Sequence, residues 1–101
     1  MKLFRDYQAK GYEVTHKRIL GNPKYTSKEA RDKDLCQEIA LLRQWLNEEK
    51  NVWVNVHKLS NGKFFWTIQN LLSLNPKEFF EDINFAYLEA FEYVLQNKLV
   101  Q

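Results

Sequence analysis

The chain has little glycine, proline and cysteine, and each scarcity excludes a class of protein. Its 101 residues include three glycines, two prolines and one cysteine. Three scattered glycines form no glycine-rich phosphate-binding loop, which excludes the nucleotide-binding proteins that depend on one. The single cysteine, Cys36, cannot form an internal disulfide, and this favours a reducing compartment.

Long apolar runs are also missing. No stretch approaches the roughly 20 apolar residues that a helix needs to span a bilayer. The first ten residues, MKLFRDYQAK, lack the apolar centre of a secretion signal. We therefore expect a cytoplasmic protein with no membrane partner.

Aromatic and charged residues are plentiful, and the charges are unevenly placed. Hydrophobic residues make up 45% of the chain and aromatic residues 15%, enough for the core of one domain over residues 1–101. Residues 1–33 carry nine basic and four acidic side chains, whereas residues 34–101 carry six and nine. We divide the domain into a basic N-terminal segment, residues 1–25, and a helix–hairpin–helix core, residues 26–101. A basic segment can bind nucleic acid or an acidic protein surface. Alternatively, it is a solvated surface that only keeps the protein soluble.

The clearest structural signal is a β-hairpin within residues 51–69, NVWVNVHKLSNGKFFWTIQ. Two β-rich runs flank Asn61-Gly62, a dipeptide typical of hairpin turns. A three-residue loop over 60–62, with Gly62 in the left-handed conformation, would pair Val56 with Trp66 and keep apolar residues on one side.

This register divides the hairpin into two faces, because side chains alternate along a strand. The predicted core face consists of Val52, Val54, Val56, Phe64, Trp66 and Ile68. The opposite face, called here the second sheet face, consists of Trp53, Asn55, His57, Phe65, Thr67 and Gln69. Its two large aromatic residues are unusual for solvent-facing surface and typical of binding anchors.

Helices are predicted on both sides of the hairpin. A capping box, Thr26-Ser27-Lys28-Glu29, would start a helix that ends near Glu49. Its buried stripe is Leu35, Ile39, Leu42 and Leu46, widened by Leu41 and Trp45. The last helix covers about residues 83–99, and its start is open between Pro76 and Asp82. Its apolar face is Ile83, Tyr87, Ala90, Phe91, Val94 and Leu95. Phe85 falls on the polar side, where it is either covered by residues 70–80 or exposed for a partner.

The first 20 residues give weaker signals. Leu3–Lys10 could form a short helix ended by Gly11, and Tyr12–Leu20 could add a third strand at the sheet edge. The predicted fold is α+β, a small two-layer sandwich. In it, two amphipathic helices pack on one face of an antiparallel hairpin of two or three strands.

No arrangement typical of an active site is present, and we expect a protein that is not an enzyme. Cys36 falls beside the apolar stripe of the first long helix, where we expect a buried, unreactive thiol. His16, Cys36 and His57 lack the close ligand pairs of a zinc site. We therefore expect no catalytic residues, no metal and no cofactor.

The segment 44–52, QWLNEEKNV, resembles the "KWLRE-K-HNI" passage of many small Bacteroidota proteins, often carried by phages and mobile elements. The Asn61-Gly62 turn before Trp66, and Leu88-Glu89-Ala90, are similar to later landmarks of the same proteins. The resemblance covers about residues 40–98 and implies the fold, but it supplies no functional residues. Genes of this size and setting include inhibitors of host defence, among them anti-CRISPR proteins, so the setting implies such a role by analogy.

Two functions, both of binding, are therefore expected. In the first, the protein inhibits or modulates a host protein or nucleoprotein complex, as a monomer or a homodimer. The partner-binding residues would be Trp53, Asn55, His57, Phe65 and Thr67, with basic contacts from Lys10, Lys17, Arg18 and Lys24. In the alternative, the sheet aromatics stack on RNA or DNA bases and the basic N-terminus neutralises phosphates. It is also open whether Tyr7, Tyr12 and Val14 fold over the second sheet face and bury it.

Overall fold

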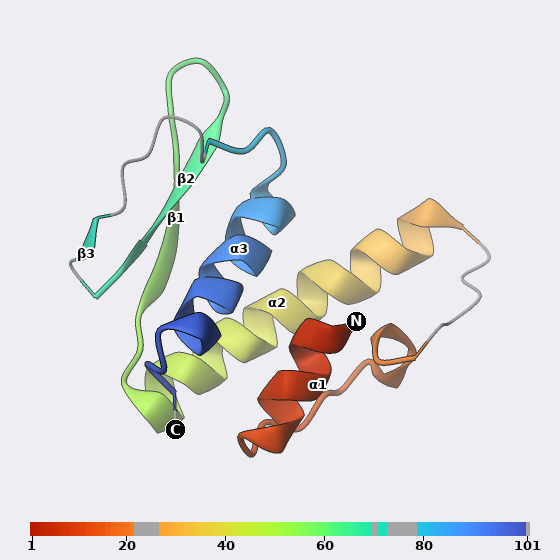
Figure 1. Cartoon of the computed structure of the whole chain (residues 1–101). Helices are drawn as coiled ribbons and strands as arrows, with labels where there is room; N and C mark the ends of the chain where they lie inside the picture. Colours follow the sequence, from red (N-terminus) through yellow and green to blue (C-terminus); the bar gives the residue numbers. More distant parts are fainter. Residues whose placement is uncertain (22–26, 70, 73–78, 101) are drawn as a thin grey trace.

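In a computed structural model, the described residues of the chain form three α-helices, a turn of 3₁₀-helix and a small antiparallel sheet (Figure 1). The elements are α1 (Lys2–Ala9), η1 (Lys17–Ile19), α2 (Lys28–Lys50), β1 (Val54–Lys58), β2 (Phe64–Ile68), β3 (Leu71–Leu72) and α3 (Ile83–Gln96). The structure describes residues 1–21, 27–69, 71–72 and 79–100. The predicted α+β class is confirmed.

The hairpin has the predicted register. Val54 lies opposite Ile68 and Val56 opposite Trp66. The amide of Leu59 donates to the carbonyl of Lys63 at 2.7 Å, which leaves residues 60–62 as the loop. Gly62 has a φ of +85°, the left-handed conformation that a side chain would disfavour.

The sheet is extended on the other side of β2. The strand order is β1-β2-β3, and Phe80 adds a single antiparallel bridge with Phe64. Strand β1 is therefore an edge strand.

The third strand predicted over Tyr12–Leu20 is wrong. These residues are all described, and they form an irregular segment followed by η1. The backbone amides of Thr15 and His16 donate to the carboxylate of Glu38, at 3.1 and 2.7 Å. A side chain of α2 thus takes the donors that a sheet ladder would have used.

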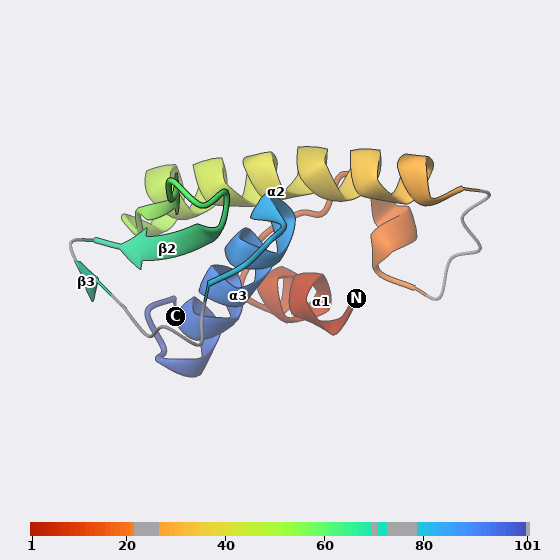
Figure 2. The same cartoon turned by 90° about the horizontal axis from the view of Figure 1, so that it is seen from above.

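Helix α3 lies across the core face of the hairpin, and α2 runs past α3 and the start of β1 (Figure 2). The ring of Trp66 lies 4.9 Å from that of Tyr93 on α3. The predicted stripe of α2 is confirmed at Ile39, Leu42 and Leu46, which are buried. Leu41, predicted to widen that stripe, is instead 39% exposed, because α2 buries only one side.

The helix caps differ in part from the prediction. Ser27 caps α2 by accepting from the Ala30 amide at 3.1 Å. The predicted cap, Thr26, lies outside the described residues. Asp82 caps α3 by accepting from the Asn84 amide at 2.7 Å, and the alternative start at Pro76 also lies outside the described residues.

The predicted apolar face of α3 is confirmed except at its first residue, since Tyr87 and Leu95 also pack against the core cluster. Ala86, Ala90, Phe91 and Val94 are buried. Ile83, predicted for the same face, is 44% exposed, because it is the first residue of the helix.

The basic N-terminal segment belongs to the hydrophobic core. Helix α1 ends before Gly11, which has a φ of +103°, as predicted. Six apolar side chains of this segment are part of the buried cluster: Leu3, Phe4, Tyr7, Tyr12, Val14 and Ile19. The boundary near residue 25 therefore separates regions of different charge that share one core.

Candidate functional site

The second sheet face carries a cross-strand aromatic pair. His57 on β1 lies opposite Phe65 on β2, and their rings stack with centroids 5.0 Å apart. The Nε2 atom of His57 lies 3.0 Å from the hydroxyl of Thr67. Two contacts therefore fix the orientation of the imidazole, which itself remains exposed.

Trp53 lies on the same face, immediately before β1, and 50% of its surface is exposed. It borders a shallow hollow of about 280 Å³ whose other walls include Arg43 and Asn47 of α2. A large aromatic side chain thus stands at the junction of sheet and helix, half available for contact with another molecule.

Asn55 is held by a residue that the sequence did not single out. The guanidinium of Arg43 donates to the Asn55 side-chain oxygen at 2.9 Å and to the Val54 carbonyl at 2.8 Å. These bonds tie α2 to the outer edge of β1. The side-chain oxygen of Asn55 already accepts a hydrogen bond from Arg43. The role of Asn55 is therefore mainly to hold the second sheet face in place.

Phe79 is a second addition to the face. Its ring lies edge-on to Phe65 with centroids 6.4 Å apart. Its neighbour Phe80 bridges to Phe64, and alternation then places Phe79 on the same side as Phe65. The doublet Phe79-Phe80 is visible in the sequence, but its pairing with β2 is not.

The described part of the N-terminal segment, residues 1–21, does not cover the second sheet face. Tyr7, Tyr12 and Val14 are buried on the helical side of the molecule. The Tyr7 hydroxyl donates to the Phe91 carbonyl at 2.7 Å, and the ring of Tyr12 packs against Trp45. Helix α3 separates α1 from the sheet in both views (Figures 1 and 2).

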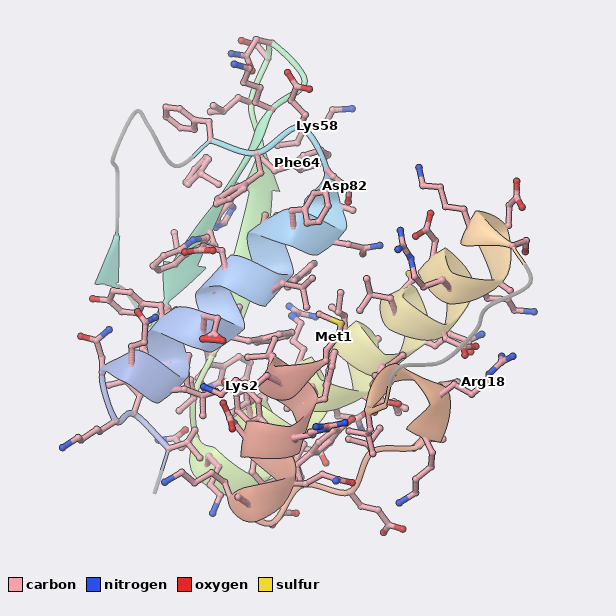
Figure 3. All side chains as sticks on the ribbon, turned by 45° about the vertical axis from the view of Figure 1, so that its right-hand side comes forward. Met1, Lys2, Arg18, Lys58, Phe64 and Asp82 are labelled. Carbon is pink, nitrogen blue, oxygen red and sulfur yellow. The ribbon has the colours of Figure 1, made fainter. Side chains whose placement is uncertain are left out.

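The predicted basic contacts do not gather beside the aromatic face. Lys10 and Lys17 are exposed at the end of α1 and in η1. Arg18 pairs with Asp34 of α2 at 2.8 Å, and Figure 3 places it far from Lys58 on the hairpin. Lys24 lies outside the described residues.

A buried carboxylate organises the N-terminal segment. Glu38 is fully buried and accepts from the Tyr12 hydroxyl, from the amides of Thr15 and His16, and from the His16 ring at 2.8 Å. Burial alone would raise the pKa of Glu38, but the bonds from Tyr12, His16 and Thr15 outweigh it and lower that pKa. Burial and the neighbouring carboxylate raise the pKa of Tyr12. Among the described residues, the hydrogen-bond partners of Glu38 all belong to residues 12–16, so its role is to hold that segment on α2.

Cys36 corrects one prediction. Its thiol is exposed, not buried, because the buried face of α2 turns toward Asp34, Glu38 and Ile39. Within the described parts of the chain, no three His, Cys, Asp or Glu side chains are grouped to hold a metal ion. No helix in those parts is both long enough and apolar enough to cross a membrane.

Comparison with protein-family models, with curated proteins and with solved structures finds no match to this chain.

Proposed function

We propose that the protein is a non-enzymatic binding module whose second sheet face docks on a partner protein. One observation carries the proposal: the half-exposed Trp53 and the stacked pair His57–Phe65 belong to the same face of a hairpin of fixed register. Aromatic side chains of this kind contribute much of the binding energy at protein interfaces.

The arrangement suits tight, stoichiometric binding. His57 is already oriented by Phe65 and Thr67, so less side-chain freedom is lost on binding. Trp53 supplies apolar area, and the imidazole and the Thr67 hydroxyl supply polar contacts. The expected mechanism is occlusion, in which the bound module blocks or retunes a working surface of its partner.

The resemblance to mobile-element proteins supports a more specific partner. We propose a host defence protein or its nucleoprotein complex, which the module inhibits in the manner of anti-CRISPR proteins. This part of the proposal rests on the setting of such genes and on no residue of the second sheet face.

Direct nucleic-acid binding through this face has weaker support. Phosphate contacts would need basic side chains around the aromatic pair. Helix α1 lies across α3 from it (Figure 1), with Lys10 directly after α1, and Arg18 is already paired with Asp34. The hairpin itself offers only Lys58 and Lys63 among the described residues.

The test is an affinity capture from a bacterial host lysate at moderate salt, with and without nuclease. Wild type is compared with the double variant Trp53→Ala/Phe65→Ala. The matched control is Leu41→Ala, which removes an exposed apolar side chain from α2. Thermal denaturation confirms that each variant is folded.

We expect a stoichiometric protein that survives nuclease, is retained by the Leu41→Ala control and is lost with the double variant. Retention by a folded double variant would show that the second sheet face is not the docking site. Loss of all bound material after nuclease would assign the protein to nucleic-acid binding instead.

A further inference from the structure

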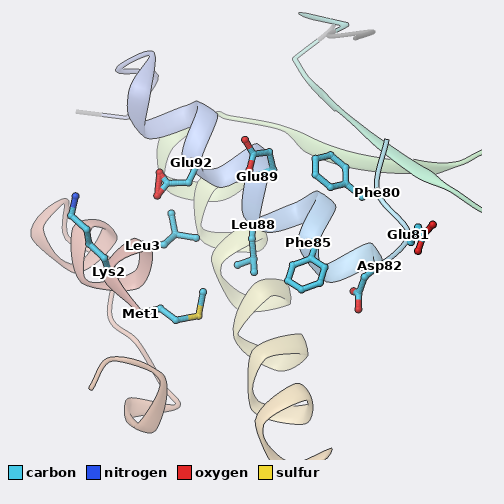
Figure 4. A pocket seen from close by; sticks show the side chains of 10 residues that line it. All are labelled: Met1, Lys2, Leu3, Phe80, Glu81, Asp82, Phe85, Leu88, Glu89 and Glu92. Carbon is cyan, nitrogen blue, oxygen red and sulfur yellow. The ribbon is translucent and has the colours of Figure 1, made fainter. Parts of the chain in front are cut away.

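A second hollow lies beside α3 and reaches from the start of α1 to Phe80, the residue that bridges to β2. It has a volume of about 950 Å³ and is open to solvent between the start of α1 and the first half of α3 (Figure 4). Its apolar wall is formed by Met1, which precedes α1, by Leu3 of α1, by Phe85 and Leu88 of α3, and by Phe80, which bridges to Phe64 of β2. We call this feature the α1/α3 groove.

Two residues of the apolar wall are exposed, whereas Leu3 is buried. Phe85 is 61% exposed and Met1 41% exposed. A smaller hollow of about 450 Å³ adjoins the groove and shares Met1, Phe85 and Leu88 with it. This smaller hollow extends to Ile19. Phe85 therefore stands between two depressions with apolar walls. Contiguous apolar surface of this kind typically marks an interaction site.

The polar side of the groove is acidic. Its described lining carries four carboxylates, from Glu81, Asp82, Glu89 and Glu92, against two positive groups. These are the Lys2 side chain and the Met1 ammonium, which donates to the Ile19 carbonyl. Lys2 is itself 3.9 Å from Asp6. An apolar floor with one sign of charge beside it selects a ligand that is apolar on one side and positively charged on the other.

We infer that the α1/α3 groove binds a basic amphipathic helix of a partner protein. Phe85, Leu88 and Glu92 follow one another at spacings of three and four residues, so they form one stripe along α3. That stripe is about 10 Å long at ~1.5 Å per residue, the length of two helical turns. A partner helix laid beside it places its apolar side chains against Phe85 and Leu88 and its lysines or arginines beside the acidic groups.

Other occupants fit the groove less well. Nucleic acid and anionic lipid would meet four carboxylates. A second copy of this chain has a basic amphipathic helix in α1, but its apolar residues Leu3, Phe4 and Tyr7 are buried in the core. The groove is also separate from the second sheet face, so the inference does not depend on the function proposed above.

The test uses synthetic peptides and the full chain. The probe is a helical peptide of about 16 residues with leucines at i, i+3, i+4 and i+7 and lysines elsewhere. One control peptide has glutamates in place of the lysines, and another has the same composition in scrambled order. Affinity is measured by fluorescence anisotropy, and the site is located by amide chemical shifts of the ¹⁵N-labelled protein.

Two variants test the two halves of the inference. Phe85→Lys removes the apolar anchor, and Glu89→Lys reverses an exposed charge. The matched control is Glu49→Lys, which reverses an exposed charge on α2. We expect the lysine peptide to bind and to shift Leu88 and Glu89. Phe85→Lys and Glu89→Lys should each weaken binding at least tenfold, and Glu49→Lys and Trp53→Ala should leave it within twofold.

Four results would overturn the inference. They are no binding of the lysine peptide, equal binding of the glutamate or scrambled peptide, shifts centred on the second sheet face, and unchanged affinity of the folded Phe85→Lys or Glu89→Lys protein. Self-association in sedimentation that Phe85→Lys abolishes would instead assign the groove to a second copy of the chain.

Discussion

Replacing Glu38 with Gln tests whether the buried carboxylate holds the N-terminal segment through its charge. One oxygen of Glu38 accepts from the Thr15 amide, the His16 amide and the His16 ring, at 3.1, 2.7 and 2.8 Å. The amide oxygen of Gln can take the same place, and its NH₂ group can donate to the Tyr12 hydroxyl. Glu38→Gln therefore preserves shape and removes the negative charge.

The expected loss follows from the strength of charged hydrogen bonds. A bond to an ionised group contributes about 1.5–3 kcal/mol and a neutral bond about 0.5–1.5. Replacing three charged hydrogen bonds with neutral ones costs roughly 3 kcal/mol in total. A neutral amide costs less to bury than a carboxylate, and this difference offsets part of the loss. We expect Glu38→Gln to lower the free energy of unfolding by about 1–2 kcal/mol at neutral pH.

The same difference should depend on pH. The pKa of Glu38 in the folded protein lies below its ordinary value of 4.5. The stabilisation by the ionised carboxylate is therefore complete above pH 4.5 and is lost as the pH falls through the folded-state pKa. At low pH wild type carries a neutral acid, so the two proteins should converge in stability.

Urea denaturation across a pH series down to about 3 measures both effects. Glu49→Gln is the control, since Glu49 is exposed on the same helix and should change stability by less than about 0.5 kcal/mol. Equal stability of Glu38→Gln and wild type at neutral pH, or a difference that persists unchanged in acid, would refute the role assigned to the carboxylate.

Three further predictions concern the core and the turn. Trp66→Ala should cost about 3–5 kcal/mol of the roughly 5–15 available, because Trp66 is only 3% exposed. An unchanged melting temperature for this variant would contradict the packing of the core face. Tyr7→Phe should cost about 1 kcal/mol in urea denaturation, because the Phe91 carbonyl loses a buried donor. An unchanged free energy of unfolding would mean that the Tyr7 hydrogen bond does not stabilise the fold. Gly62→Ala should cost about 1 kcal/mol because of the +85° φ; a stabilised variant would exclude the left-handed turn.

The hairpin could be predicted because its signals are local. The Asn61-Gly62 turn and the alternation of apolar residues were sufficient to pair Val56 with Trp66. The stripe of α2 was predictable for the same reason, since Ile39, Leu42 and Leu46 repeat with the helical period.

The N-terminal segment was not predictable in this way. Residues 12–16 are fixed by bonds to Glu38, which lies more than 20 residues later in the chain. No local pattern distinguishes such a glutamate from the exposed ones on the same helix. Val14 and Ile19 resembled a strand because an irregular segment that packs on a core also buries apolar side chains.

The binding surfaces were predictable only in part. Alternation along the strands placed Trp53, His57 and Phe65 on one face, but the contribution of Phe79 depends on a pairing across residues far apart in sequence. Phe85 stood out as an apolar residue on a polar helix side. The groove beside it depends on Met1, which only the tertiary fold brings to α3.

The position of the N-terminal segment determines how its charges can be studied. Leu3, Phe4 and Tyr7 are buried, and Arg5 donates to the Leu20 carbonyl at 2.6 Å. A truncation that removes the basic residues would also remove part of the core and one wall of the α1/α3 groove. Lost binding in such a truncation would say nothing about charge. Single replacements at the exposed Lys10 and Lys17 leave the core intact, so they can separate an electrostatic role from a structural one.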